Sequence, residues 1–121
     1  MERIMDPAAV ARLEAIGGKG LVQSLATLVR EELPPRLQRL EEARAKRDAA
    51  ALGPAAHALV SATGNFGAWS LAELARSVEQ RAPDANWEAL DADVARLRAS
   101  GERFLAELAE LGGTAPEDAR G

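Results

Sequence analysis

The chain has 121 residues, of which 47% are hydrophobic and 28% charged, the balance of a single globular domain. It has no cysteine and only one histidine, His57, which excludes disulfide scaffolds, cysteine-ligated metals, thiol catalysis and sites that need two imidazoles. The net charge is −4, and no basic stripe indicates binding to nucleic acid. No apolar run has the pattern of a signal peptide or approaches the ~20 residues of a membrane span. We therefore expect a cytoplasmic protein.

The first predicted helix is short. It opens at Asp6-Pro7, because Asp is a favoured N-cap and Pro suits the first helical position. Its apolar stripe consists of Val10, Leu13 and Ile16. The glycine-rich run at residues 17–20 ends this helix and makes a turn.

The second predicted helix covers about residues 20–46. Apolar residues recur in it at three- and four-residue steps: Val22, Leu25, Val29, Leu33, Leu37 and Leu40. Pro34 and Pro35 fall in its middle, where prolines remove backbone donors and clash with the preceding turn. We therefore expect a kink here, or two helices that meet near Leu33.

The third and fourth predicted helices follow a charged stretch. Asp48 is the candidate cap of a helix over about residues 48–64, and residues 64–67 form a weak point between the two elements. Ser70 to Glu73 has the pattern of a capping box, which opens the fourth helix. The run Ala82-Pro83-Asp84 then ends that helix.

The last predicted helix begins near Asp84 or Asn86 and stops at Gly112-Gly113, with one interruption of its apolar seam at Gly101. The sequence thus predicts an all-α protein, an up-and-down four-helix bundle with a short N-terminal leading helix. We expect the bundle to occupy residues 1–113 and the tail, residues 114–121, to be disordered.

His57 points away from the predicted core, since it lies about 200° around the third helix from Leu59. Gly53, Ser61 and Gly64 fall on the same side of the helix. These small residues leave the imidazole open to close approach by another protein. An ordinary surface histidine is the alternative, with glycines that serve helix packing or mark the end of the helix.

The segment around this histidine, residues 55–68, resembles the signature of histidine-containing phosphotransfer (HPt) domains. The matching residues are Ala56, His57, Leu59, Phe66, Gly67 and Ala68. The resemblance covers most of the chain, and the family fold is a four-helix bundle. Two positions depart from the family pattern: Val60 stands where the family has a lysine, and Ser61 stands where it has a glycine.

The resemblance implies that His57 is a phosphoacceptor. It would take a phosphoryl group from a receiver aspartate and pass it to another receiver, because a neutral imidazole is a nucleophile at pH 7. Gly53, Val60, Ser61 and Gly64 would lie near the phosphate or the docked partner. Gly67 and Ala68 would belong to the structural motif.

The resemblance also implies the partners, which are a response-regulator receiver domain and a hybrid sensor histidine kinase. We expect the receiver to bring the Mg²⁺, and this chain to hold no cofactor or metal and to act as a monomeric phosphocarrier rather than a stand-alone catalyst. Because Val60 replaces the lysine that would help neutralise the phosphoryl group, a pseudo-HPt adaptor that binds a receiver or kinase without phosphotransfer is an alternative. A plain helical adaptor is a third.

Overall fold

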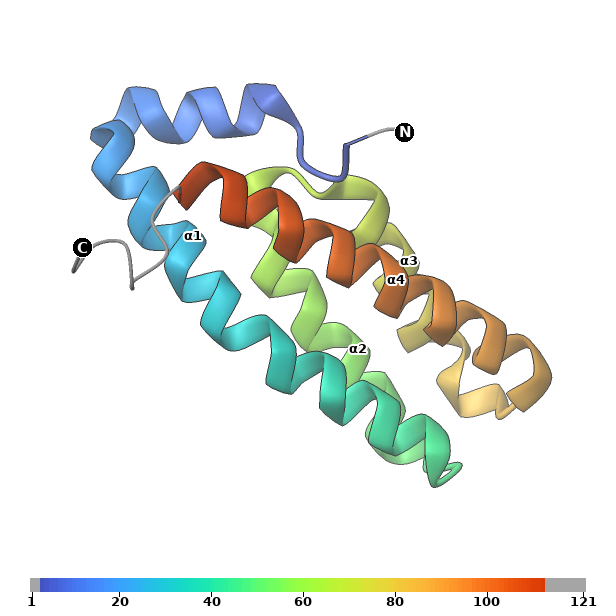
Figure 1. Ribbon diagram of the computed structural model, residues 1–121. Helices are drawn as coiled ribbons and strands as arrows, with labels where there is room; N and C mark the ends of the chain where they lie inside the picture. Colours follow the sequence, from blue (N-terminus) through green and yellow to red (C-terminus); the bar gives the residue numbers. More distant parts are fainter. Residues whose placement is uncertain (1–2, 113–121) are drawn as a thin grey trace.

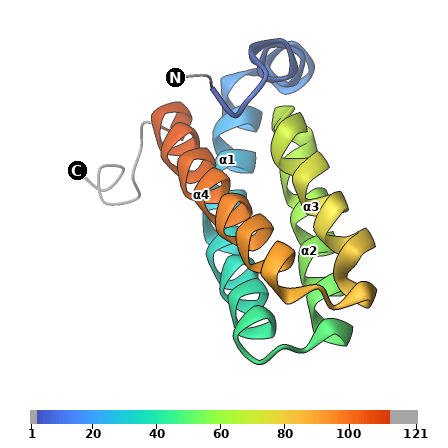
Figure 2. The same ribbon diagram turned by 90° about the vertical axis from the view of Figure 1, so that its right-hand side faces the viewer.

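The computed structural model describes residues 3–112, and these form four α-helices joined by short turns. The helices are α1 (Pro7–Ala45), α2 (Ala49–Thr63), α3 (Trp69–Arg81) and α4 (Trp87–Gly112), with the 3-10 helices η1 (Gly64–Phe66) and η2 (Ala82–Asp84) between them. Consecutive helices run in opposite directions around one core (Figure 1 and Figure 2). The expected all-α four-helix bundle is therefore confirmed.

The predicted leading helix is the first part of α1. Asp6 caps it, since its side chain accepts a hydrogen bond from the N–H of Ala8 over 2.9 Å. At Gly18 the backbone leaves helical geometry, with φ 77° and ψ −176°, values that glycine adopts without strain. Residues 7–17, hereafter the N-terminal arm, lie across one end of the bundle (Figure 1 and Figure 2). Ile16, expected in the apolar stripe, is 78% exposed.

The break expected near Leu33 is wrong. Helix α1 continues across Pro34 and Pro35, and Gly18 alone departs from helical φ/ψ within it. Both prolines are exposed, whereas Leu33 is buried. The carbonyl groups that lose their N–H partners therefore face water, which can satisfy them, and the buried side of the helix keeps its packing.

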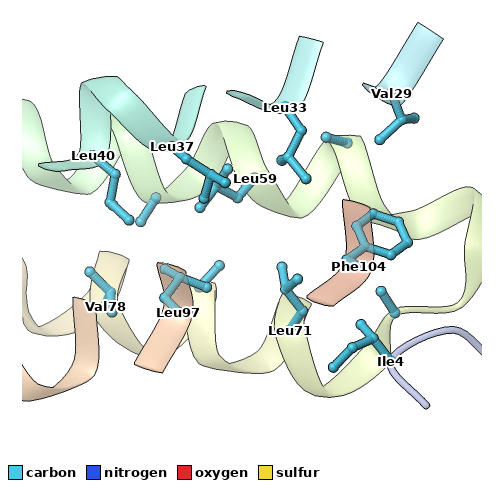
Figure 3. Close-up of a cluster of buried hydrophobic side chains, with 14 of the residues drawn as sticks. Ile4, Val29, Leu33, Leu37, Leu40, Leu59, Leu71, Val78, Leu97 and Phe104 are labelled. Carbon is cyan, nitrogen blue, oxygen red and sulfur yellow. The ribbon is translucent and has the colours of Figure 1, made fainter. Parts of the chain in front are cut away.

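The core contains the apolar stripes of all four helices. Leu33, Leu40, Leu59, Leu97 and Phe104 are fully buried in it, and Figure 3 shows side chains from α1, α2, α3 and α4 meeting there. The rings of Phe66 and Phe104 pack edge to face, with centroids 6.2 Å apart. The apolar stripe predicted over about residues 20–46 is buried as expected, apart from the half-buried Leu25.

Gly101 interrupts the apolar seam of α4 for a packing reason. A Cβ atom built at this position would lie 3.0 Å from both Cδ atoms of Leu37. Helix α4 continues through it without a break. The glycine therefore lets α4 approach α1 closely.

The connection from α2 to α3 differs in part from the sequence prediction. Asp48 caps α2 as expected, accepting from the N–H of Ala51 over 3.1 Å. At the other end Gly67 has a left-handed φ of 65°, and α3 begins directly after the buried Ala68. The capping box predicted at Ser70 is wrong, because Ser70 already lies inside α3 and the N-cap residue makes no side-chain hydrogen bond.

The connection from α3 to α4 agrees with the predicted break. Helix η2 covers Ala82–Asp84, and Ala85 then adopts a left-handed φ of 53°. The side chain of Asn86 accepts from the N–H of Ala89 over 3.4 Å at the start of α4. Within residues 3–112, no helix is long and apolar enough to cross a membrane.

Candidate functional site

His57 projects from the middle of α2 into solvent. The neighbouring Ala56 and Leu59 are completely buried in the core, whereas 68% of the His57 side chain is exposed. This agrees with the helical phase inferred from the sequence. An imidazole on a rigid helix, with its base anchored by core residues, is accessible to another protein without any rearrangement of the bundle.

Glu79 of α3 contacts one nitrogen of this imidazole. Its Oε1 atom lies 3.2 Å from Nδ1 of His57, and its side chain is 38% exposed. An ionised carboxylate only accepts hydrogen bonds, so this contact favours the tautomer with the proton on Nδ1. The other nitrogen, Nε2, then keeps its lone pair free for a nucleophilic role.

A surface hollow of about 480 Å³ lies beside the imidazole. Side chains of α2, α3 and η2 line it: His57, Val60, Arg76, Glu79, Gln80 and Pro83. Val60, the position where a lysine was expected by resemblance, is half-buried at its edge. The cation of this hollow is Arg76, which is exposed and comes from the neighbouring helix.

Two of the small residues predicted around His57 are on the surface. Ser61 is exposed, and its hydroxyl donates to the carbonyl oxygen of Ala58 over 3.1 Å. Gly64 is exposed too, and a Cβ atom added there would meet nothing within 4 Å. Together they leave a surface without large side chains, one to two turns beyond the imidazole.

The expectation that Gly53 belongs to this docking surface is wrong. Gly53 is buried, and a Cβ atom built on it would lie 3.8 Å from the carbonyl oxygen of Glu79 and 3.9 Å from Cβ of Ala82. These are ordinary van der Waals distances, so Gly53 lies in the packed interface of α2 with the end of α3 and η2. Gly53 therefore offers no exposed surface to a partner.

Gly67 and Ala68, the other residues of the motif, lie in the turn that joins α2 and α3. A Cβ atom on Gly67 would lie 2.6 Å from Cβ of Asp6 and 2.8 Å from Cβ of Ala9. Ala68 is completely buried. Gly67 thus allows the N-terminal arm to approach this turn closely, Ala68 belongs to the core, and neither residue lines the imidazole hollow.

His57 could be identified from the sequence, whereas the side chains that α3 brings to it could not. Glu79 and Arg76 lie 22 and 19 positions further along the chain, so no local pattern connects them with His57. The antiparallel pairing of α2 and α3 through a short turn could have located them approximately. Among residues 3–112, no group of three or more His, Cys, Asp or Glu side chains is placed to hold a metal ion.

The comparisons with known proteins agree with this geometry. A family model described as "Hpt domain" matches residues 24–113. The match includes all of α2 and α3 and every residue of the hollow, and it begins after the turn at Gly18. No curated protein and no solved structure gave a significant match.

Proposed function

The chain belongs to the Hpt domain family, whose members act in histidine phosphotransfer, and we propose that His57 carries a phosphoryl group between receiver domains of a phosphorelay. One observation carries this proposal. His57 is exposed on helix α2 with Nδ1 in contact with Glu79 at 3.2 Å, which leaves Nε2 as the nucleophile. The proposed direction is from the receiver of a hybrid sensor histidine kinase to a second receiver.

The transfer step needs one nucleophile from this chain. The lone pair of His57 Nε2 attacks phosphorus of an aspartyl phosphate, and the new N–P bond forms as the P–O bond to the aspartyl carboxylate breaks. The carboxylate leaves with the bonding electron pair. No proton has to move in this step, because Nε2 carries none. The imidazole ring gains positive charge, which the Glu79 carboxylate at Nδ1 offsets.

The partner supplies the rest of the chemistry in this proposal. Phosphoryl transfer depends mostly on positioning and on stabilisation of charge. The receiver would bring the acidic pocket and its Mg²⁺. This chain would bring the accessible imidazole and the surface without large side chains at Ser61 and Gly64. The reverse of the same step would deliver the phosphoryl group to the second receiver.

A specific observation supports a second candidate function. Val60 offers no cation at the position of the family lysine. A pseudo-HPt adaptor would keep the docking surface around His57 and bind a receiver or kinase without accepting a phosphoryl group.

One experiment separates the two functions. A panel of receiver domains is phosphorylated with radiolabelled acetyl phosphate, repurified and incubated with the chain or with His57→Gln. Phosphotransfer predicts acid-labile, base-stable label on the wild type and none on the variant. The adaptor function predicts a complex with a receiver and no label on either. Label retained by a folded His57→Gln variant would rule out His57 as the acceptor.

A further inference from the structure

We propose that Arg76 is the cation that neutralises the phosphoryl group on His57, in place of a lysine at position 60. This inference rests on the proposed function and adds a second catalytic residue to it. It assigns the guanidinium to a different helix, α3, from the one that carries the acceptor. The chain would then be an active phosphocarrier in spite of Val60.

The position of Arg76 supports this role. Arg76 and Glu79 are three residues apart in α3, so they lie on the same face of the helix. Both line the hollow that contains His57 and Val60. Because α2 and α3 are antiparallel, the Arg76 side chain enters this hollow from α3, opposite the turn of α2 on which Val60 lies. The Arg76 guanidinium and the ammonium group of a lysine at position 60 would therefore both lie beside a phosphoryl group on His57.

The charge at the site calls for such a cation. The Glu79 carboxylate is 3.2 Å from Nδ1, and a phosphoryl group on Nε2 would add about two further negative charges at pH 7. Since Glu79 already offsets the positive charge that the ring gains, the charge of the phosphoryl group itself needs a separate cation. A guanidinium can donate two hydrogen bonds to two phosphoryl oxygens, which is the geometry that arginine offers to phosphates.

Arg76 is also available. In residues 3–112 it makes no hydrogen bond or ion pair, and its side chain is exposed. Two arginines that do not line the hollow are engaged elsewhere: Arg36 donates to the carbonyl oxygen of Ala58 over 3.0 Å and pairs with Glu32, and Arg81 is paired with Asp93. The cation with unused donors on this hollow is therefore Arg76.

The test is single-turnover transfer from a labelled, saturating receiver domain to five forms of the chain. These are wild type, Arg76→Lys, Arg76→Gln, the double variant Arg76→Gln/Val60→Lys, and Arg12→Gln. The last is the matched control, which removes one positive charge from the N-terminal arm outside the hollow. Receiver affinity by calorimetry and the melting temperature are measured for each form.

We expect Arg76→Gln to transfer roughly three- to tenfold more slowly than wild type, since a partly exposed charge contact is screened by water. Arg76→Lys should retain an intermediate rate, and Val60→Lys in the Arg76→Gln background should recover much of the loss. Arg12→Gln should match wild type. Melting temperatures should remain within a few degrees of one another, because position 76 is exposed.

Two results would overturn the inference while leaving the proposed function intact. One is a labelled wild type with Arg76→Gln transferring at the same saturated rate. The other is a loss of receiver affinity in Arg76→Gln without a change in the saturated rate, which would assign Arg76 to docking. A wild type that binds receivers and takes no label would instead reject the proposed function, and this inference with it.

Discussion

The backbone N–H of Asp6 donates to the carbonyl oxygen of Phe66 over 3.1 Å, which ties the start of α1 to the turn after α2. The carboxylate of Asp6 adds two contacts. It caps α1 through Ala8, and its Oδ2 atom accepts from the indole Nε1 of Trp69 over 3.1 Å. The N-terminal arm is thereby fixed on the connection between α2 and α3, the two helices that carry His57 and Glu79.

Gly67 and Gly64 should respond in opposite ways to the same substitution. Gly67→Ala should lower the free energy of unfolding by about 1–3 kcal/mol or more, because its φ of 65° is left-handed and its Cβ atom would lie 2.6 Å from Cβ of Asp6. Gly64→Ala should be neutral or stabilising by up to about 1 kcal/mol, since its φ is −64° and the space is open. Urea unfolding measures both. Equal stability of the two variants would contradict the packing described for this turn.

The hydrogen bond from Trp69 should make stability depend on pH. The indole N–H of Trp69, and secondarily the N–H of Ala8, hold the pKa of Asp6 below its ordinary value. Because the folded-state pKa is the lower one, this stabilisation is present above the ordinary Asp pKa of about 3.9 and is lost as the pH falls through the folded-state value. Trp69→Phe should therefore raise the Asp6 pKa and move acid unfolding to higher pH.

Acid titration followed by circular dichroism measures this shift, and Trp87→Phe is the control, since the Trp87 ring packs under Arg47 and has no contact with Asp6. The stability difference between wild type and Trp69→Phe should shrink below pH 4. If that difference were constant from pH 7 to pH 3, the Asp6–Trp69 bond would have no role in it.

Glu107 and Glu110 lie near the C-terminal end of α4. The buried Glu107 should contribute more to the free energy of unfolding than the exposed Glu110. Its carboxylate accepts from the backbone N–H of Ile4 over 2.8 Å and of Met5 over 2.9 Å. Glu107→Gln would turn an amide donor toward one of these N–H groups, and leaving a buried donor unpaired costs about 1–3 kcal/mol. Glu110→Gln is the matched control, because the exposed pair of Glu110 with Arg3 should contribute at most about 1 kcal/mol.

Thermal unfolding and amide hydrogen exchange measure the two variants. Glu107→Gln should melt several degrees lower than Glu110→Gln, and the Ile4 and Met5 amides should exchange faster in it. Unchanged exchange at both amides would mean that these hydrogen bonds do not hold the N-terminal segment in solution.

Much of the fold follows from local pattern. The buried stripe of α1 and the seam of α4 are amphipathic at the helical period, so their core faces could be identified from residue spacing. Gly18 makes its turn because glycine adopts positive φ without strain. His57 is exposed because the core residues Ala56 and Leu59 fix the phase of its helix.

The remaining features depend on tertiary contacts that local pattern does not encode. Helix α1 continues across Pro34 and Pro35, which are exposed, while Leu33 and Leu37 on either side of them are buried in the core. Gly53 could not be assigned to packing without knowing that α3 lies against it. The contact between His57 and Glu79 required the register of two antiparallel helices.

A bulky substitution at Ser61 should affect docking before it affects the fold. Ser61 is exposed one turn beyond His57, and its hydroxyl bonds only to its own helix. Ser61→Arg should therefore weaken receiver binding about tenfold or more while the melting temperature changes little. Ser24→Arg, the same change at an exposed position of α1, is the control. Unchanged receiver affinity by calorimetry together with a large loss of melting temperature would place Ser61 in the core.

Glu79 should act on transfer through the tautomer of His57. Glu79→Ala removes the acceptor at Nδ1, so part of the imidazole population would carry its proton on Nε2, where it blocks attack. We expect single-turnover transfer from a saturating receiver to fall roughly three- to tenfold, a modest loss because the contact is partly exposed. Glu79→Gln keeps an acceptor without the charge and should fall between wild type and Glu79→Ala. Glu73→Ala, an exposed glutamate of the same helix, should leave the rate unchanged. Nitrogen NMR of the His57 ring reports the tautomer directly. An unchanged tautomer and transfer rate in Glu79→Ala would show that the His57 imidazole does not need Glu79 to keep its proton on Nδ1.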